Sequence, residues 1–305
     1  MHIRDIFAEH QTTFSFEFFP PKSEAGAAEL FSNIAELESL RPTFVSATYG
    51  AGGSTRELTH DLVVKLKTST TLDPVPHLTC VCHDEGEIDA ILSRYAQAGI
   101  SNLMVLRGDV PKGLPAGAEP WKGFRYASEL VRHVRRFNDR NLHRDRRGFG
   151  IGVAGYPEGH CETPNRMAEL ERLKAKVDEG ADFIVTQLFF DNRDFYDFRA
   201  RCELAGIRVP IIAGIMPITS AAGMRRMAEL ALGARYPAPL IRAINRTGGD
   251  EDAVRRVGVH WATEQCRDLL DHNVAGIHFY TLNRSTATRE IYATLGVKDS
   301  QGLRS

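Results

Sequence analysis

The chain has few cysteines, almost no net charge and no long apolar run. Its five cysteines are an odd number without the spacing of a disulfide framework, which favours a reducing compartment. The formal net charge of −1 and the pI near 6.8 give no reason to expect nucleic acid or an acidic membrane as partner. No stretch approaches the roughly 20 apolar residues of a membrane span, and the first residues lack an apolar core of signal-peptide length. These absences predict a cytoplasmic protein.

The chain also shows no linker, no low-complexity segment and no change of composition along its length. Its 305 residues, 43% hydrophobic and 25% charged, are ordinary for a globular protein and suffice for one α/β barrel or two smaller domains. Because nothing divides the sequence, we expect a single domain over residues 1–305.

Short β-rich apolar runs alternate with segments of helical period eight times along the chain. The expected strands are 13–19, 43–49, 75–82, 102–107, 149–156, 183–190, 209–216 and 274–282. Gly99, Gly180 and Gly206 stand where three helices need a residue of positive φ before the next strand. Such alternation predicts a (β/α)8 barrel, with a doubly wound open sheet as the alternative. The helical region 238–272 is an expected elaboration before the last strand.

Residues 13–22, TFSFEFFPPK, place one carboxylate inside an aromatic strand. Glu17 lies among phenylalanines, and Pro20 and Pro21 end the strand. A buried charge without a partner is costly, so Glu17 is either a functional group or lies on the solvent face of an edge strand. The strand alone favours neither interpretation.

Polar residues on the other strands favour a functional Glu17. In a barrel, the active site forms at the C-terminal ends of the strands. Seven of the expected strands deliver polar residues to that rim: Glu17; Thr48 and Tyr49; His77; Arg107 and Asp109; Tyr156, Glu158 and His160; Thr186 and Gln187; Tyr280, Asn283 and Arg284. We therefore expect a concave site for a large polar ligand.

Two motifs suggest a nucleotide or a metal but do not fit their context. Gly150-x-Gly152-x-x-Gly155 matches the dinucleotide fingerprint, yet its glycines fall within a strand that no helix follows. Their small size would instead let a flat ligand or a neighbouring backbone approach. In HLTCVCH, strand alternation would put His77 and His83 on one face and both cysteines on the other, so we expect no metal site.

Three further segments are open to more than one interpretation. Residues 49–55, YGAGGST, could hold a phosphate or form a plain loop. The arginine-rich stretch 132–147 could bind nucleic acid, but its apolar period favours the solvent side of an amphipathic helix. The Pro/Gly-rich connection 109–123 is long enough to form a lid.

Eight motifs follow one another in a fixed order: FEFFPPK, TYGAGGSTRE, HLTC, LRGD, YPEGH, TQLFFD, GIMP and HFYTLNR. Together they closely resemble the methylenetetrahydrofolate reductases. The resemblance implies a barrel that binds FAD, takes a hydride from NADH or NADPH, and reduces 5,10-methylenetetrahydrofolate to 5-methyltetrahydrofolate for methionine synthesis. Its partners would be these small molecules, and we also expect a homo-oligomer. With no residues after 305 to form the regulatory domain of the eukaryotic enzymes, we expect no inhibition by S-adenosylmethionine.

The resemblance also assigns roles by position. Glu17 matches the family's general acid, and Asp109 matches the aspartate near the flavin ring and the pterin. The positions that match flavin contacts are Tyr49, Ala51, His77, Arg107, Gly108, Ala127, Tyr156, His160 and Lys176. Thr48 and Gln187 match contacts to nicotinamide or folate, and Tyr280 and Arg284 are expected to contact the substrate.

Two positions depart from the family pattern. Glu169 stands where many relatives have an aspartate that contacts ribose or adenine, and Met227 where some bacterial relatives have a phenylalanine that packs on NADH.

The general-acid role agrees with the chemistry of the substrate. Opening the five-membered ring of methylene-folate requires a proton on the leaving amine. Among phenylalanines, Glu17 is expected to be protonated through desolvation. Two rival functions remain: a pterin-handling methyltransferase without flavin, and a non-catalytic flavin- or folate-binding subunit. The flavin-contact positions favour the reductase over the first rival, and Glu17 with Asp109 over the second.

Overall fold

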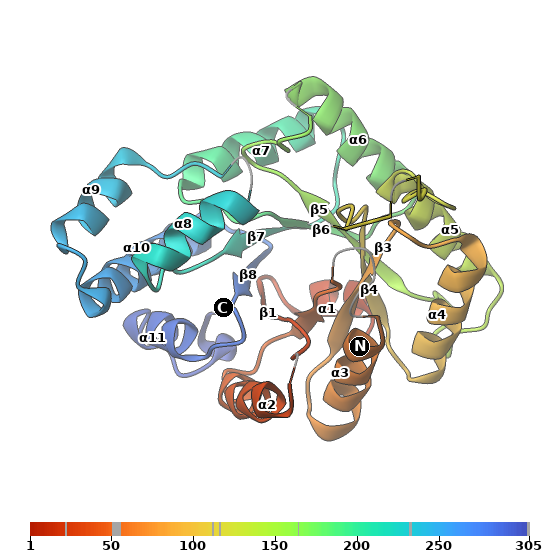
Figure 1. Cartoon of the computed structure of the whole chain (residues 1–305), viewed down its shortest axis with the longest axis horizontal. Helices are drawn as coiled ribbons and strands as arrows, with labels where there is room; N and C mark the ends of the chain where they lie inside the picture. Colours follow the sequence, from red (N-terminus) through yellow and green to blue (C-terminus); the bar gives the residue numbers. More distant parts are fainter. Residues whose placement is uncertain are drawn as a thin grey trace.

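The computed structural model describes residues 1–21, 23–50, 56–111, 113–115, 117–163, 165–231 and 234–303. In this part of the chain, eight parallel strands close into a barrel in which β8 pairs with β1 (Figure 1). The strands are β1 Thr13–Phe18, β2 Phe44–Ala47, β3 Pro74–Thr79, β4 Asn102–Leu106, β5 Gly150–Gly155, β6 Phe183–Thr186, β7 Ile211–Ile215 and β8 Gly276–Tyr280. The predicted (β/α)8 barrel is confirmed, and the open sheet is excluded because every strand is paired on both sides.

The first helix lies at one end of the barrel, and the later helices surround it in the order of the sequence (Figure 1). They are α1 Ile3–Glu9, α2 Glu24–Glu38, α3 Arg56–Ser69, α4 Glu85–Gln97, α5 Ala127–Asp139, α6 Arg166–Asp178, α7 Asn192–Leu204, α8 Ala221–Leu230, α9 Ala238–Arg246, α10 Glu251–Asp271 and α11 Thr286–Thr294, followed by the 3-10 helix η2 Ser300–Leu303. Helices α9 and α10 confirm the elaboration expected at 238–272. In Figure 1, α9 extends beyond the ring.

The glycines predicted to end three helices have the backbone conformation that this role requires. Gly99 follows α4 with φ 73°, Gly180 follows α6 with φ 111°, and Gly206 follows α7 with φ 76°. A residue with a Cβ is strained at such angles, so glycine is the residue that turns each helix toward the next strand.

The lower part of the barrel interior is a packed apolar layer. Phe44, Met104 and Phe183 cluster there with Ile3 and Ile6 of α1. The short first helix therefore closes the end of the barrel opposite the strands' C-termini.

The three glycines of the apparent dinucleotide fingerprint all lie in β5, as expected. At Gly152, however, the space is taken by side chains and not by a ligand or a backbone. A Cβ there would lie 2.4 Å from Phe183 Cζ and 2.8 Å from Met104 Sδ. The glycine is required by the packing of the apolar layer.

Several strands end earlier than predicted. The sixth, expected to reach residue 190, ends at Thr186, because its pairing with β7 includes only Ile184 and Val185. The third ends at Thr79, so the alternation argued through residue 83 does not continue that far. His83 lies instead against Tyr49, 3.2 Å from its hydroxyl.

The arginine-rich segment is an amphipathic helix and its following loop, as predicted. Helix α5 buries Leu130, Val134 and Phe137 against the core. The arginines 132, 135, 140 and 147 are paired with acidic side chains, so their charge is already balanced within the fold.

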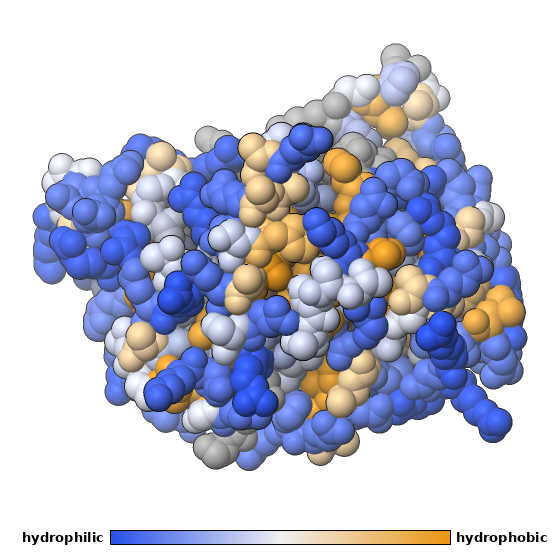
Figure 2. Space-filling model, turned by 90° about the horizontal axis from the view of Figure 1, so that it is seen from below, coloured by the Kyte–Doolittle hydropathy of each residue, from blue (hydrophilic) through white to orange (hydrophobic). Residues whose placement is uncertain are grey.

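The face drawn in Figure 2 is largely hydrophilic, with small apolar patches near its middle. Among the described residues, no helix combines the length and the apolar character needed to cross a membrane.

Candidate functional site

A cavity of about 1130 Å³ opens at the C-terminal ends of the barrel strands. Each of the eight strands, or the loop directly after it, contributes to its lining, and so do α6 and α8. Ligand pockets commonly measure about 300–1,000 Å³, so this cavity has room for a dinucleotide and part of a second ligand.

Glu17 lies on the inner face of β1, between two histidines. Its Oε2 is 3.5 Å from His77 Nε2 on β3 and 4.0 Å from His278 Nε2 on β8. The Glu17 side chain is 19% exposed, so it can reach a ligand in the cavity. Burial lowers the pKa of His77, which keeps this imidazole neutral at neutral pH.

The prediction that phenylalanines surround Glu17 is wrong. Successive side chains of a strand point to opposite faces, and Phe14, Phe16 and Phe18 pack outward in the core shared with the helices. Glu17 shares the inner face with Ser15, and its partners are imidazoles. Because β1 pairs with both β2 and β8, the edge-strand alternative is also excluded.

The backbone around Glu17 is held by the turn that follows β8. Thr281 Oγ1 donates to the carbonyl oxygen of Glu17 at 2.7 Å. Asn283 accepts from the amide of Phe19 at 2.9 Å and donates to its carbonyl at 2.8 Å. Leu282 and Asn283 have φ of 51° and 60°, a conformation that costs free energy in residues other than glycine. The turn thereby fixes the end of β1 and the height of Glu17 in the cavity.

Charged side chains line the opposite part of the cavity. Arg107, after β4, pairs with Glu162 at 2.7 Å and lies over the Trp121 ring, 4.3 Å from its centroid. On α6, Lys176 Nζ donates to the Ala154 carbonyl at 2.5 Å, and burial lowers its pKa to about 8.

Two buried polar atoms in this region have no hydrogen-bond partner among the described residues: Arg107 Nε and Glu169 Oε1. The other carboxylate oxygen of Glu169 accepts from the His160 amide at 2.8 Å. A buried polar atom left unpaired costs about 1–3 kcal/mol. Both residues line the cavity, where a bound ligand could supply the missing partners.

Gly108 brings the chain between Arg107 and Asp109 close to β3. Its φ is 78°, and a Cβ would lie 2.7 Å from Val81 Cγ1 and 2.9 Å from Thr79 Cβ. Only glycine fits there without displacing β3 or the loop after it. Asp109 follows directly as an exposed residue at the cavity wall.

The tyrosines of the site are held by burial and by hydrogen bonds. Burial raises the pKa of Tyr49, Tyr156 and Tyr280, so all three hydroxyls keep their protons. The Tyr280 hydroxyl donates to the Thr186 carbonyl at 2.7 Å. Tyr280 therefore offers a ligand its ring more readily than its hydroxyl.

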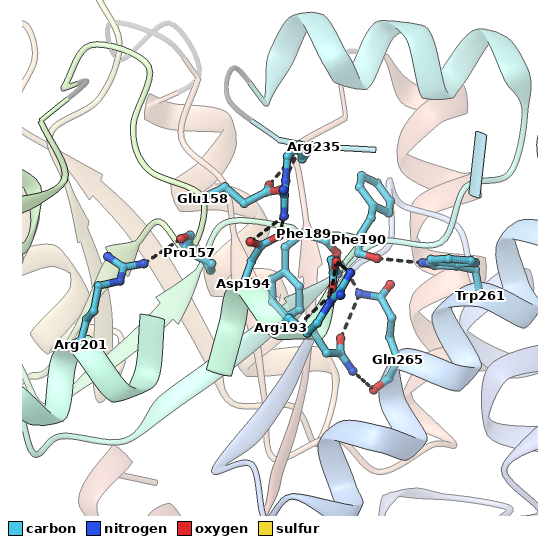
Figure 3. Close-up of polar contacts among 12 residues, drawn as sticks. Pro157, Glu158, Phe189, Phe190, Arg193, Asp194, Arg201, Arg235, Trp261 and Gln265 are labelled. Carbon is cyan, nitrogen blue, oxygen red and sulfur yellow. Dashed lines mark hydrogen bonds and ion pairs between the residues drawn. The ribbon is translucent and has the colours of Figure 1, made fainter. Parts of the chain in front are cut away.

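A clasp of three charged residues links the rim loops beside the cavity (Figure 3). The Arg235 backbone amide donates to Glu158 at 2.9 Å, and its guanidinium donates to Asp194 at 2.6 Å. Burial raises the pKa of Glu158 to about 7. Nearby, Trp261 Nε1 donates to the Phe190 carbonyl at 3.0 Å, which joins α10 to the loop after β6.

The structure brings most of the predicted site residues together. Those that line the cavity are Glu17, Thr48, Tyr49, His77, Arg107, Gly108, Asp109, Ala127, Tyr156, His160, Glu169, Lys176, Gln187 and Tyr280, together with Met227. Arg284 is exposed and does not line it. Ala51 and most of the proposed phosphate loop 49–55 lie outside the described residues. The lid at 109–123 stays a prediction.

Sequence reasoning missed the polar residues beside Glu17. Ser15, Ser46 and His278 are buried, and the hydroxyls of Ser15 and Ser46 both lie within hydrogen-bonding distance of His278. Strict alternation in TFSFEF could have placed Ser15 with Glu17, but the contact to His278 crosses 263 positions of sequence.

Comparison with known proteins gives consistent results. A family model described as methylenetetrahydrofolate reductase matches residues 2–296. Methylenetetrahydrofolate reductase (NADH) 1 of Arabidopsis thaliana is 39% identical over 99% of this chain and 51% of its own length. The 5,10-methylenetetrahydrofolate reductase of Escherichia coli is 38% identical over 94% of this chain and 92% of its own. The chain spans about half the length of the plant and yeast relatives it matches.

Solved structures support the fold. An uncharacterized protein from Clostridium thermocellum that binds two copies of 5-methyl-5,6,7,8-tetrahydrofolic acid superposes with a TM-score of 0.64 at 12% identity, over 95% of this chain and 96% of that chain. Oxaloacetate acetylhydrolase superposes with a TM-score of 0.52 at 11% identity, over 96% of this chain and 84% of its own. At such identities the likeness concerns the barrel alone. Because the family model matches residues 2–296 and the chain covers 92% of the E. coli relative at 38% identity, the chain belongs to the methylenetetrahydrofolate reductase family.

Proposed function

We propose that the chain is a flavin-dependent reductase that converts 5,10-methylenetetrahydrofolate to 5-methyltetrahydrofolate with NADH or NADPH, a product used in methionine synthesis. One observation carries the proposal: Glu17 and the charged residues Arg107, Glu169 and Lys176 open onto the same cavity. The proposed proton donor and the proposed site of an anionic cofactor thus share one cavity.

The residues of the charged region fit FAD. Its pyrophosphate is anionic, and Arg107, Arg172 and Lys176 line this part of the cavity. Glu169 Oε1 and Arg107 Nε are buried and lack partners among the described residues, so a ribose hydroxyl and a phosphate oxygen could complete them. The extra methylene of Glu169, compared with aspartate, is accommodated by its bond to the His160 amide.

The chemistry that FAD supplies when bound is the transfer of a hydride from the nicotinamide to the folate. The protein's own contribution is to place both substrates and to move a proton. In our proposal, His77, Arg107, Gly108, Tyr156, His160 and Lys176 hold the cofactor, with Tyr49, Ala51 and Ala127 as further contacts.

Glu17 donates the proton that opens the substrate ring. Protonation of the leaving amine of methylene-folate yields an iminium cation that can accept a hydride. Glu17 loses one proton to the folate nitrogen in each turnover and regains it from solvent through the open cavity. The pKa of His77, 3.5 Å from Glu17, is lowered by burial, so this imidazole is neutral beside the proposed acid.

The remaining predicted residues would position the substrates. Asp109 would hold the pterin amide and adjust the electronics of the cofactor. Gln187 and Tyr280 would contact the folate from β6 and β8, and Arg284 would do so from the exposed turn after β8. Thr48 would contact nicotinamide or folate. We infer that the protein is a homo-oligomer and that each barrel suffices for the reaction.

Because nicotinamide and folate must each face the same part of the cofactor, we propose that they use one pocket in turn. The buried Met227 lines this pocket and would pack on the nicotinamide. Steady-state rates measured at several concentrations of both substrates should then give parallel double-reciprocal lines. Intersecting lines would exclude this order.

The visible absorption spectrum tests the proposed function directly. Purified protein supplied with FAD should show a bound-flavin spectrum that bleaches on anaerobic addition of NADH or NADPH and returns with methylenetetrahydrofolate. If no flavin binds, a flavin-free pterin enzyme becomes the better interpretation. If flavin binds but does not cycle, the chain acts as a binding subunit.

A further inference from the structure

A buried hydrogen-bonded group lies directly behind Glu17 and has no part in the function proposed above. It consists of Ser15 on β1, Ser46 on β2 and His278 on β8, which are 0%, 3% and 2% exposed. Ser15 is the register partner of His278, and Ser46 is the register partner of Glu17. The group therefore spans the three strands that meet at the acid.

The ring of His278 is fixed on every side. Its Nδ1 lies 2.7 Å from Ser15 Oγ and its Nε2 lies 3.3 Å from Ser46 Oγ. One face stacks on Phe44 at an interplanar angle of 18°, and Tyr280 meets the ring at 89°. Held in this way, the ring turns its Nε2 edge toward Ser46 and Glu17.

Both imidazoles approach the same oxygen of Glu17. His77 Nε2 lies 3.5 Å and His278 Nε2 lies 4.0 Å from Oε2. At these distances neither imidazole is hydrogen-bonded to Glu17, but an imidazole N–H that faces Oε2 favours the more electron-rich carboxyl oxygen at that position. The acidic proton is then left to Oε1, which is the oxygen free to turn toward a ligand.

We propose that His278 is a positioning residue that, clamped by Ser15, sets which oxygen of Glu17 carries the proton to the substrate. In this proposal the Ser15 hydroxyl donates to Nδ1, which places the ring proton on Nε2, on the side of Ser46 and Glu17. This inference rests on the general-acid role proposed for Glu17.

Two substitutions of His278 separate its two contacts. The amide of His278→Asn can reach Ser15 but not Glu17, whereas the longer amide of His278→Gln can place a donor where Nε2 lies. We expect His278→Asn to slow reoxidation of the reduced flavin by methylenetetrahydrofolate about tenfold, and His278→Gln to recover most of that loss. Flavin reduction by NADH, which needs no proton from Glu17, should stay within about twofold in both.

A double-mutant cycle tests whether His278 acts through Glu17. In the Glu17→Gln background, His278→Asn should cause no further loss in the folate half-reaction. Losses that multiply, or a parallel fall in the NADH half-reaction, would show that His278 is only structural and overturn the inference. Unimpaired folate reduction in Glu17→Gln itself would instead refute the proposed function.

Two further variants guard against a folding defect. His143→Asn removes another buried histidine whose ring nitrogens bond to the Ile100 carbonyl and the Asp145 amide, on the outside of the barrel. It should leave both half-reactions unchanged. If His278→Asn fails to bind FAD, Ser15→Ala offers the same test, because it keeps the imidazole and frees its orientation; a normal folate half-reaction in Ser15→Ala would then contradict the proposal.

Discussion

The two sides of the cavity differ in how completely the protein satisfies them. On the Glu17 wall, formed by Glu17, His77 and His278, the buried His278 is hydrogen-bonded to Ser15, and Glu17 Oε2 lies 3.5 Å from His77 and 4.0 Å from His278. On the Lys176 wall, formed by Arg107, Glu169 and Lys176, two buried polar atoms have no partner among the described residues.

This difference agrees with the roles that we propose for the two walls. A proton donor must have its geometry set before the substrate arrives, since reorganisation during the reaction would raise the barrier. A cofactor site can leave donors and acceptors unpaired because the ligand completes them, and their cost of about 1–3 kcal/mol each in the empty protein favours binding. Substitutions in the Glu17 wall should therefore affect the folate half-reaction, and substitutions in the Lys176 wall should affect FAD binding.

The largest expected effect is on the Glu17 wall. Glu17→Gln keeps the size of the side chain but cannot donate an acidic proton, and general acids contribute about 10²–10⁴-fold to a rate. We expect reoxidation of the reduced flavin by methylenetetrahydrofolate to fall by about that factor, measured by stopped-flow absorbance. Binding of FAD and its reduction by NADH should persist; unimpaired folate turnover would refute the assignment.

A smaller effect is expected on the Lys176 wall. Lys176→Met removes a buried cation, and a hydrogen bond to a charged group is worth about 1.5–3 kcal/mol, so the dissociation constant of FAD should rise about tenfold or more. The matched control is Lys174→Met on the same helix, since Lys174 is ion-paired with Asp178 and does not line the cavity. Equal FAD affinity in the two variants would contradict a role for Lys176.

The pH dependence of FAD binding sharpens the same test. The pKa of Lys176 is lowered to about 8, so the free protein loses this charge as the pH rises through 8. Because bound pyrophosphate favours the charged form, FAD affinity should fall above pH 8 by up to about tenfold per pH unit. In Lys176→Met, equilibrium titrations should show no such fall. Without FAD, the variant should be at least as stable as the parent, because it no longer buries a charge.

The sequence predicted most residues of the Lys176 wall. The strand and helix alternation and the glycines at 99, 180 and 206 predicted the barrel, and the barrel placed Arg107 and Tyr156 at one rim. These two residues stand at the ends of strands, where topology alone brings them together. Lys176, on α6, was expected only from the family resemblance.

The Glu17 wall was predicted less well. Glu17 was expected among phenylalanines, yet the alternation of β1 turns Phe16 and Phe18 to the other face. His278 is one residue in an apolar run, and its contact with Ser15 depends on the register of the first strand with the last. Register across a closed barrel is set by packing and is not encoded in any local motif.

Asp109 lines the same cavity as both walls, and its substitution should change the redox energetics of the cofactor more than the rate. Asp109→Asn removes a negative charge near the proposed flavin ring, which should make the reduced cofactor easier to form. We expect the midpoint potential of the bound flavin to become more positive, as measured by dye-coupled redox titration. An unchanged potential together with normal folate affinity would argue against both roles of Asp109.

The smallest expected effect concerns the clasp beside the cavity. Glu158 has a pKa raised to about 7 by burial, while in the unfolded chain it would titrate near its ordinary value of 4.5. The folded protein therefore holds this proton more tightly, so the stabilising contribution of Glu158 is complete below pH 4.5 and is lost as the pH rises through 7.

Glu158→Gln removes this titration and keeps an oxygen that can accept from the Arg235 amide. As the pH rises from 6 to 8, the thermal midpoint of the parent should therefore fall relative to that of the variant by about 2–4 °C. Glu203→Gln, at an exposed carboxylate on α7, should show no such change with pH. If the two variants follow the same pH course, the ion pair with Arg235 keeps Glu158 charged across this range. The clasp would then permanently join the loop after β5, the start of α7 and the segment between α8 and α9, and it would differ from the Lys176 wall because its charges are already paired.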